Sequence, residues 1–219
     1  PHGIPISYTI PKGDPHDIDL TATITAAALR GSSEVEEEDI RVRIRKARAK
    51  RLYVILLDSS GSMAVMKRIA IAKGVAMKLI MNAYVKRDEL ALISFRGNRS
   101  EIVVPPTRKY NDVLTSLNNV KTGGRTPLPS ALYNLLMLAK VFKVKHKNSV
   151  VTGVLITDGK ANVPLWRSVK EDIEKLSEDL KKTGIKLEIY DTRPNGVIDP
   201  SPSYIDIIAS ITGATVHKV

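Results

Sequence analysis

The sequence has 219 residues, enough for one sizeable α/β domain with an extension or for two small domains. It contains no cysteine, which excludes a disulfide framework and any thiolate metal site. The net charge is +11, from 34 Lys and Arg against 23 Asp and Glu, so nucleic acid, a membrane surface and an acidic protein are all open as partners.

The first fifty residues differ in composition from the rest, and we expect residues 1–50 to form an N-terminal extension. The stretch 1–17 is rich in Pro and Gly and should be extended and turn-rich. Residues 18–29 mix strand and helix formers, whereas 40–45 alternate with period two, as in an edge strand with one wet face. The basic run RVRIRKARAKR (41–51) is either a solvated strand and linker or a docking arm for an acidic surface.

From residue 51 to residue 219, apolar runs alternate with amphipathic segments. The predicted strands are short and aliphatic, at 52–58, 89–95, 100–105, 149–158, 185–191 and 214–219. The predicted helices have apolar residues at helical spacing, at 66–85, 110–120, 128–144, 169–184 and 203–213. This alternation predicts an α/β domain over 51–219, with a doubly wound, mostly parallel central sheet and helices on both faces.

Polar side chains follow two of the predicted strands at the point where each strand ends. Asp58 closes one apolar run and is followed by Ser60 and Ser62, while Asp158 closes another. Thr126 lies in the glycine-rich segment KTGGRTPL, just before a helix. Ligands bind beyond the carboxyl ends of the strands in doubly wound folds, so we expect these five side chains to meet there.

Two carboxylates and three hydroxyls are hard oxygen donors, which suit a hard divalent cation. The set has no bidentate glutamate, which favours Mg²⁺ or Mn²⁺ over Ca²⁺. If Asp58 and Asp158 are both ionised, they balance the two charges of the ion, and the neutral hydroxyls leave it electrophilic. An oxygen from outside, such as a carboxylate of another protein, would then complete its coordination.

The pattern Asp58-x-Ser60-x-Ser62, with Thr126 and Asp158 later in the chain, resembles the metal-ion-dependent adhesion site of von Willebrand factor A (integrin I-like) domains. The spacing, the loops and the strand context all agree with that family. The resemblance implies that these five residues hold the ion. In a purely structural interpretation, Ser62 and Thr126 would instead cap the helices that follow them.

Longer segments resemble the C-terminal, integrin I-like domain of the magnesium chelatase D subunit. They cover nearly all of the chain and include AYVKRDELALISFRG, VVPPTRKY, TGGRTPLPSAL and VLITDGKANVPL. The ATPase-like domain and the acidic, proline-rich linker of the full-length subunit do not occur in this sequence. The chain starts with proline, so two interpretations stay open: a fragment of a longer subunit, or a stand-alone relative that serves another ATPase motor.

The resemblance implies a magnesium-dependent interaction module in a complex that inserts Mg²⁺ into a tetrapyrrole with the energy of ATP. Its partners would be an ATPase-type chelatase subunit, the large catalytic subunit, or both, with an Asp or Glu of the partner bound to the ion. Arg96 and Arg125 are candidates to contact that partner. No G-x-x-x-x-G-K-[ST] motif occurs, so we expect no ATP hydrolysis by a P-loop and no catalysis by this chain alone.

The sequence gives less support to two other functions. A magnesium-dependent phosphatase would need a second acid two residues after Asp58, where Ser60 stands. Nucleic-acid binding through the basic run 41–51 lacks the aromatic residues on which bases stack. No apolar run reaches the roughly 20 residues that span a bilayer, and there is no signal-peptide segment, so a cytoplasmic location without membrane contact is expected.

Overall fold

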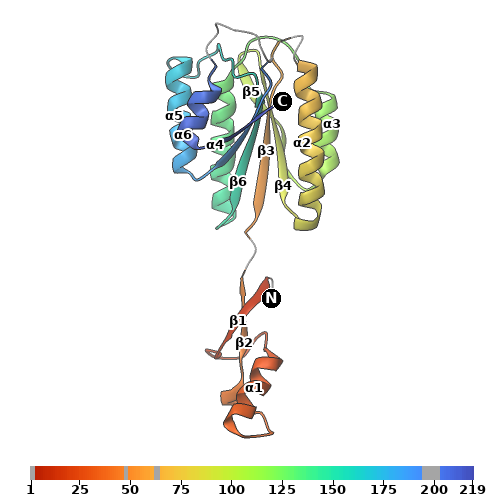
Figure 1. Ribbon diagram of the computed structural model, residues 1–219, viewed down its shortest axis with the longest axis vertical. Coiled ribbons are helices and arrows are strands. Elements are labelled where there is room, and N and C mark those ends of the chain that lie inside the picture. Colours follow the sequence, from red (N-terminus) through yellow and green to blue (C-terminus); the bar gives the residue numbers. More distant parts are fainter. Residues whose placement is uncertain (1–2, 47–48, 62–64, 194–202) are drawn as a thin grey trace. The chain divides into compact units, whose positions relative to one another are not determined.

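The computed structural model describes residues 3–46, 49–61, 65–193 and 203–219 (Figure 1). The chain divides into two compact units, Pro1–Ala49 and Lys50–Val219. A search of the described residues finds no helix with the length and apolar character of a membrane span.

The N-terminal unit consists of a two-stranded antiparallel sheet and a helix. Strand β1 (Ile4–Thr9) pairs with β2 (Val42–Lys46), which is the alternating segment of the sequence. The segment with mixed propensities forms helix α1 (Leu20–Arg30), followed by a short 3₁₀ turn, η1 (Glu37–Asp39). Helix α1 begins where the Asp19 carboxylate accepts a hydrogen bond from the Ala22 amide at 3.1 Å, and it ends before a left-handed glycine.

The second unit, here called the α/β unit, is built on a six-stranded sheet in the order β5-β4-β3-β6-β7-β8. Its strands are β3 (Arg51–Asp58), β4 (Glu89–Arg96), β5 (Arg99–Thr107), β6 (Val150–Thr157), β7 (Lys186–Asp191) and β8 (Thr215–Lys218). All neighbours are parallel except β4 and β5. The prediction of a doubly wound, mostly parallel sheet is therefore confirmed. Strand β5 is longer than predicted and includes two prolines, which an edge strand tolerates.

Helices cover both faces of this sheet (Figure 1). They are α2 (Val65–Lys86), α3 (Tyr110–Asn118), α4 (Leu128–Lys145), α5 (Val169–Lys182) and α6 (Ile205–Thr212). Helices α4, α5 and α6 pack in one apolar cluster, and α2 and α3 pack in the other.

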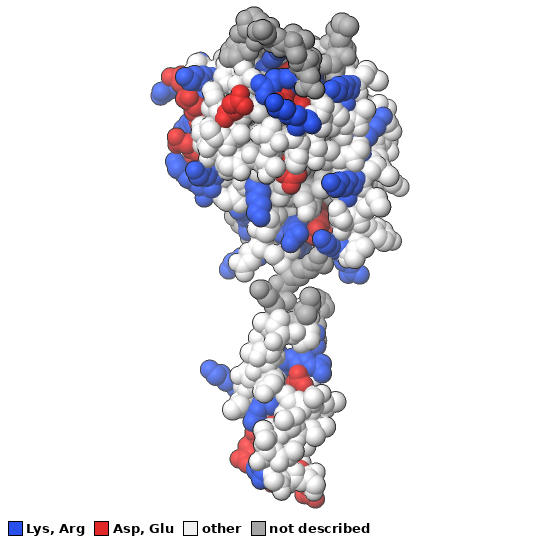
Figure 2. Space-filling view, viewed as in Figure 1, with Lys and Arg blue, Asp and Glu red and all other residues white. Residues whose placement is uncertain are grey.

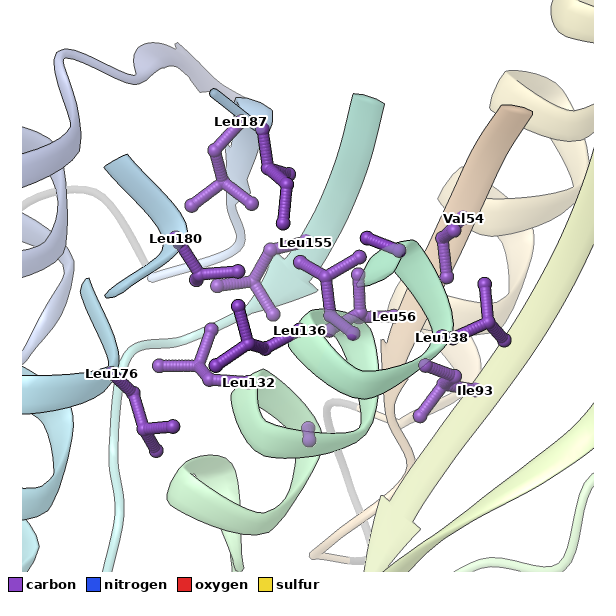
Figure 3. Packing of buried hydrophobic residues seen from close by; sticks show 14 of the residues in the cluster. Val54, Leu56, Ile93, Leu132, Leu136, Leu138, Leu155, Leu176, Leu180 and Leu187 are labelled. Carbon is purple, nitrogen blue, oxygen red and sulfur yellow. The ribbon is translucent and has the colours of Figure 1, made fainter. Parts of the chain in front are cut away.

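Strand β3 contributes to both clusters because its side chains alternate between the two faces. Leu52, Val54 and Leu56 point toward α4, and Ile55 and Leu57 point toward α2. Figure 3 shows the first cluster, in which leucines of α4 fill the space between the sheet and α5. All five of these β3 side chains are fully buried, so the strand is fixed at the centre of the sheet.

The chain order places a switch point between β3 and β6. After β3 the chain continues to β4 on one side, and β6 later returns to pair with the other side of β3. Crossover connections that leave in opposite directions open a crevice at the carboxyl ends of the two strands. Asp58 ends β3 and Asp158 directly follows β6, so both lie at this crevice.

Candidate metal and partner-binding site

The Asp58 side chain is fully buried and hydrogen-bonded at both carboxylate oxygens. Its Oδ1 accepts from the Ser60 amide at 3.0 Å and from the Ser60 hydroxyl at 2.5 Å. Its Oδ2 accepts from the Thr157 hydroxyl at 2.8 Å. Burial raises the pKa of the Asp58 carboxyl, and the nearby Arg68 guanidinium and the two hydroxyls offset this only in part. A cation beside this carboxylate would compensate the cost of its burial.

Three of the predicted side chains form one continuous chain of oxygen atoms. The Thr126 hydroxyl donates to Ser60 Oγ at 2.8 Å, and Ser60 Oγ donates to Asp58 Oδ1. Ser60 and Thr126 are 5% and 7% exposed, so the donors converge in a nearly buried place. Ser60 lies 66 residues from Thr126 in the chain, and the fold alone brings their hydroxyls together.

The loop that carries Thr126 is fixed by contacts with neighbouring loops on both sides. The Gly123 amide donates to the Ser59 carbonyl at 2.9 Å. Gly124 has φ +90°, and a Cβ there would lie 3.2 Å from the backbone of Gly97, so the two loops touch where neither carries a side chain. On the other side, the Thr126 amide donates to Asn162 Oδ1 at 2.9 Å.

Asp158 is 23% exposed at its side chain and is linked to Asp58 through Arg68. The Arg68 side chain is 2% exposed, and its Nη1 lies 3.3 Å from Asp158 Oδ2. The same guanidinium donates from Nε to the Asp58 carbonyl at 2.8 Å and from Nη2 to the Ser60 carbonyl. Ser62 lies outside the described residues. The structure therefore brings four of the five predicted metal ligands to one place.

Arg96 and Arg125 lie at the same end of the sheet. Arg96 ends β4, and it lines a cavity of about 760 Å³ together with Gly97, Arg99 and Lys121. Arg125 donates to the Asn162 carbonyl at 2.6 Å, so its guanidinium is held beside the Thr126 loop. Figure 2 shows Lys and Arg side chains at the top of the α/β unit, the end at which β3 finishes in Figure 1.

Sequence reasoning missed three residues of this site: Arg68, Thr157 and Asn162. Arg68 follows a lysine at the start of a predicted helix and has the local pattern of a solvated face, but the structure buries it on the same face of α2 as Val65 and Ile69. Thr157 precedes Asp158 at the end of a buried strand and could have been read as a partner for Asp58. Asn162 gives no local signal, since its contact with Thr126 depends on two loops that are far apart in sequence.

The donor set fits a small, hard divalent cation. Asp58, Ser60 and Thr126 present only oxygen atoms, and the two carboxylates of the site lie at the ends of two adjacent strands. Within the described ranges, no three His, Cys, Asp or Glu side chains come together as a metal cluster. The described part of the candidate site thus combines two carboxylates with neutral hydroxyls.

Some of the arginines in the basic run 41–51 form ion pairs within the N-terminal unit. Arg45 forms a bidentate pair with Asp17, and the Nη2–Oδ1 distance is 2.9 Å. Arg43 lies 3.8 Å from Asp17 and 3.5 Å from Asp19. These cations are paired inside the N-terminal unit, which leaves fewer of them for an acidic surface or a phosphate backbone.

Comparison with known proteins agrees with this architecture. Residues 53–160 match the model of the von Willebrand factor type A domain. The chain is 34% identical to the magnesium-chelatase 67 kDa subunit of Chlorobaculum parvum, over 75% of this chain and 28% of that subunit. It is also 34% identical to the magnesium-chelatase 60 kDa subunit of Cereibacter sphaeroides, over 80% of this chain and 34% of the subunit. The chain thus spans about a third of the length of these relatives.

Solved structures show the same fold at low sequence identity. The crystal structure of the SpRpn10 VWA domain matches with a TM-score of 0.56 and 12% identity, over 78% of this chain and 88% of that one. BatB from Bacteroides thetaiotaomicron, a conserved hypothetical protein, matches with a TM-score of 0.56 and 15% identity, over 78% of this chain and 90% of its own. The chain therefore carries a von Willebrand factor type A domain that is related to the subunits of magnesium chelatase.

Proposed function

We propose that this chain is a magnesium-dependent protein-interaction module of a magnesium-chelatase-type complex. Asp58, Ser60, Ser62, Thr126 and Asp158 would hold Mg²⁺ or Mn²⁺, and a partner protein would supply an Asp or Glu carboxylate. The observation that carries the proposal is the convergence of Asp58, Ser60 and Thr126 through hydrogen bonds of 2.5 and 2.8 Å. The relationship to chelatase subunits supports the type of complex.

Some residues of the site would bind the ion, and others orient the residues that bind it. Thr157 and the Ser60 amide fix the two oxygens of Asp58, so the carboxylate cannot rotate away from the crevice. Asn162 Oδ1 accepts a hydrogen bond from the Thr126 amide and thereby helps to position the Thr126 hydroxyl. When bound, the divalent cation would supply an electrophilic position that an anionic oxygen can occupy. The protein groups are therefore preorganised for a cation and leave its outer side to the partner.

Positive side chains around the crevice favour an acidic partner. Arg96, Arg99 and Lys121 line the cavity beside the site, and Glu101 is the acid among its lining residues. Arg125 adjoins Thr126 in the chain, and its guanidinium is bound to the Asn162 carbonyl. Cations on the rim of a site attract an acidic segment and orient its approach, and this effect weakens with salt. Arg96 and Arg125 are accordingly proposed to contact the partner outside the metal shell.

The test is titration calorimetry of Mg²⁺ and of Mn²⁺ into the wild type, Asp58→Ala and the control Asp112→Ala. Asp112 is an exposed acid on α3, so the control removes the same charge away from the crevice. Mutation of a residue that only orients a metal ligand typically lowers metal affinity about 10–100-fold. The loss of the ligand Asp58 should lower the affinity at least as much. Equal binding by all three proteins would refute the metal site, provided that circular dichroism shows each of them folded.

Partner capture is tested separately with the ATPase-type and the large catalytic subunits of a magnesium chelatase. Binding should disappear with a chelator or with Asp58→Ala, and it should weaken in Arg96→Ala and Arg125→Ala without loss of metal affinity. Capture that ignores chelator and falls steeply with salt would instead indicate charge attraction alone, as expected if the basic run 41–51 were the binding element.

A stand-alone role with another ATPase motor is a second candidate, and one relative favours it. An uncharacterized protein of Methanocaldococcus jannaschii is 29% identical over 62% of this chain, and the match covers 78% of that protein. A relative of that length has little room for an ATPase-like domain of its own. Such a chain would use the same metal site with a different motor, and failure to bind either chelatase subunit with the metal site intact would favour this alternative.

A further inference from the structure

Arg68 is a buried cation at the candidate site that is not one of the proposed metal ligands. It projects from the first turns of α2 into the crevice, and its side chain is only 2% exposed. A buried guanidinium is costly unless its donors are satisfied and its charge is balanced. The groups that contact this guanidinium therefore indicate its role.

The guanidinium connects both halves of the site. Two of its donors bind backbone carbonyls of the turn after β3, those of Asp58 and Ser60. A third reaches the Asp158 carboxylate at 3.3 Å, and Nη2 lies 3.9 Å from Asp58 Oδ1. The planar fork of arginine can make such contacts in several directions at once, which a lysine cannot reproduce.

The charges of these groups do not cancel. Asp58 and Asp158 contribute −2 when ionised, and Arg68 contributes +1, so the site has a net charge of −1. A divalent cation changes this to +1 in a place where charges are poorly screened, because Asp58 and Arg68 are almost completely removed from solvent. One further carboxylate returns the total to zero.

We infer that Arg68 strengthens the dependence of metal binding and carboxylate binding on each other. The guanidinium opposes a cation in the free domain, and it favours a carboxylate once the cation is bound. The free domain thus holds the metal weakly, and the acidic group of a partner strengthens metal binding. The same factor must appear in both directions because the coupling is reciprocal. This inference rests on the proposed metal site and adds to it a mechanism for recognising an anion.

The experiment measures Mn²⁺ affinity by titration calorimetry with and without acetate, in the wild type and in Arg68 variants. Acetate should tighten Mn²⁺ binding to the wild type by about tenfold, within the range usual for coupled sites. In Arg68→Met and Arg68→Gln, Mn²⁺ should bind more tightly without acetate. The gain from acetate should be clearly smaller than in the wild type, and what remains comes from acetate binding to the ion itself. Arg68→Lys keeps the charge and should keep most of the coupling.

Lys67→Met is the matched control, because it removes the same charge from the neighbouring, exposed position of α2. Its Mn²⁺ affinity and its response to acetate should equal those of the wild type. Weaker Mn²⁺ binding by folded Arg68→Met would overturn the inference and leave Arg68 as a positioning residue for the turn. A wild type that binds Mn²⁺ with no response to acetate would also overturn it, even if the neutral variants failed to fold.

The two proposals fail in different ways. If the wild type binds no Mn²⁺ with or without acetate, the metal site itself is refuted and the coupling with it. If the wild type binds Mn²⁺ and Asp58→Ala does not, the metal site stands. The response of the Arg68 variants to acetate then decides the coupling alone.

Discussion

Among the described residues of the N-terminal unit, Ala27 is the one apolar side chain that is buried, whereas β3 by itself buries five in the α/β unit. The smaller unit depends on ion pairs, such as Arg30 with Asp39 at 2.8 Å and Arg45 with Asp17. These pairs are only partly shielded from solvent, and ion pairs near a protein surface stabilise less than an apolar core and are screened by salt. A metal site needs side chains fixed within a fraction of an ångström, so it is consistent that the candidate site lies on the unit with the larger apolar core.

The largest effect should come from the apolar core. Leu132→Ala on α4 removes a fully buried side chain from the cluster in Figure 3 and should lower the free energy of unfolding of the α/β unit by about 2–5 kcal/mol. Leu29→Ala on α1 removes a side chain that is 85% exposed and should change stability by less than about 0.5 kcal/mol. Urea denaturation measures both variants, and similar losses would contradict the contrast between the units.

Within the α/β unit, the candidate site is polar, and its stability depends on hydrogen bonds. Thr157→Val keeps the shape of the side chain but removes the donor to Asp58 Oδ2, which leaves one oxygen of a buried carboxylate without that partner. We expect a loss of about 1–3 kcal/mol and a weaker affinity for Mn²⁺. Thr152→Val, at a buried position of the same strand, is the control and should leave Mn²⁺ affinity unchanged. Equal Mn²⁺ affinities in the two variants would show that Thr157 does not orient Asp58.

The sequence pattern was sufficient for the sheet and for the places where its strands end. Asp58 and Asp158 could be located because each closes an apolar run, and Thr126 because it precedes a helix in a glycine-rich loop. The function of Arg68 could not be read in the same way. An arginine beside a lysine at the start of a helix has the local pattern of a solvated face, and only the pairing of β3 with β6 brings Asp158 within its reach.

In the N-terminal unit, the local pattern of the sequence was itself ambiguous. The alternation of 40–45 correctly indicated a strand, but its partner lies in the Pro- and Gly-rich first segment, for which no strand was predicted. The segment 18–29 was ambiguous because its alanines favour a helix and its threonines and isoleucines favour a strand. The structure resolves it as a helix, with the Asp19 cap and the Gly31 terminus supplying the boundary signals.

The third difference between the two units is their stability in acid. The hydrogen bond from Arg30 lowers the pKa of Asp39, and that from Arg45 lowers the pKa of Asp17. A lowered pKa means that these pairs contribute their full stability above the ordinary value of 3.8, and lose it as the pH falls through the lowered values. Amide resonances of residues 3–46 should therefore lose dispersion at a higher pH than those of the sheet. Simultaneous loss in both units would contradict this assignment.

The smallest effect concerns Trp166, the one tryptophan of the sequence, which is 53% exposed. Its ring meets Tyr133 edge to face at 5.6 Å, and Lys175 Nζ lies 5.7 Å from its centre. Lys175→Met should cost about 0.5 kcal/mol and alter the tryptophan fluorescence, because a cation above an exposed ring is only weakly stabilising. Lys170→Met on the same helix removes a cation that pairs with Glu174 instead, so it should leave the fluorescence unchanged. A clearly larger loss of unfolding free energy in Lys175→Met would mean that the contact between Lys175 and Trp166 stabilises the α/β unit more than its exposure predicts. Surface pairs of the α/β unit would then be stronger than those of the N-terminal unit.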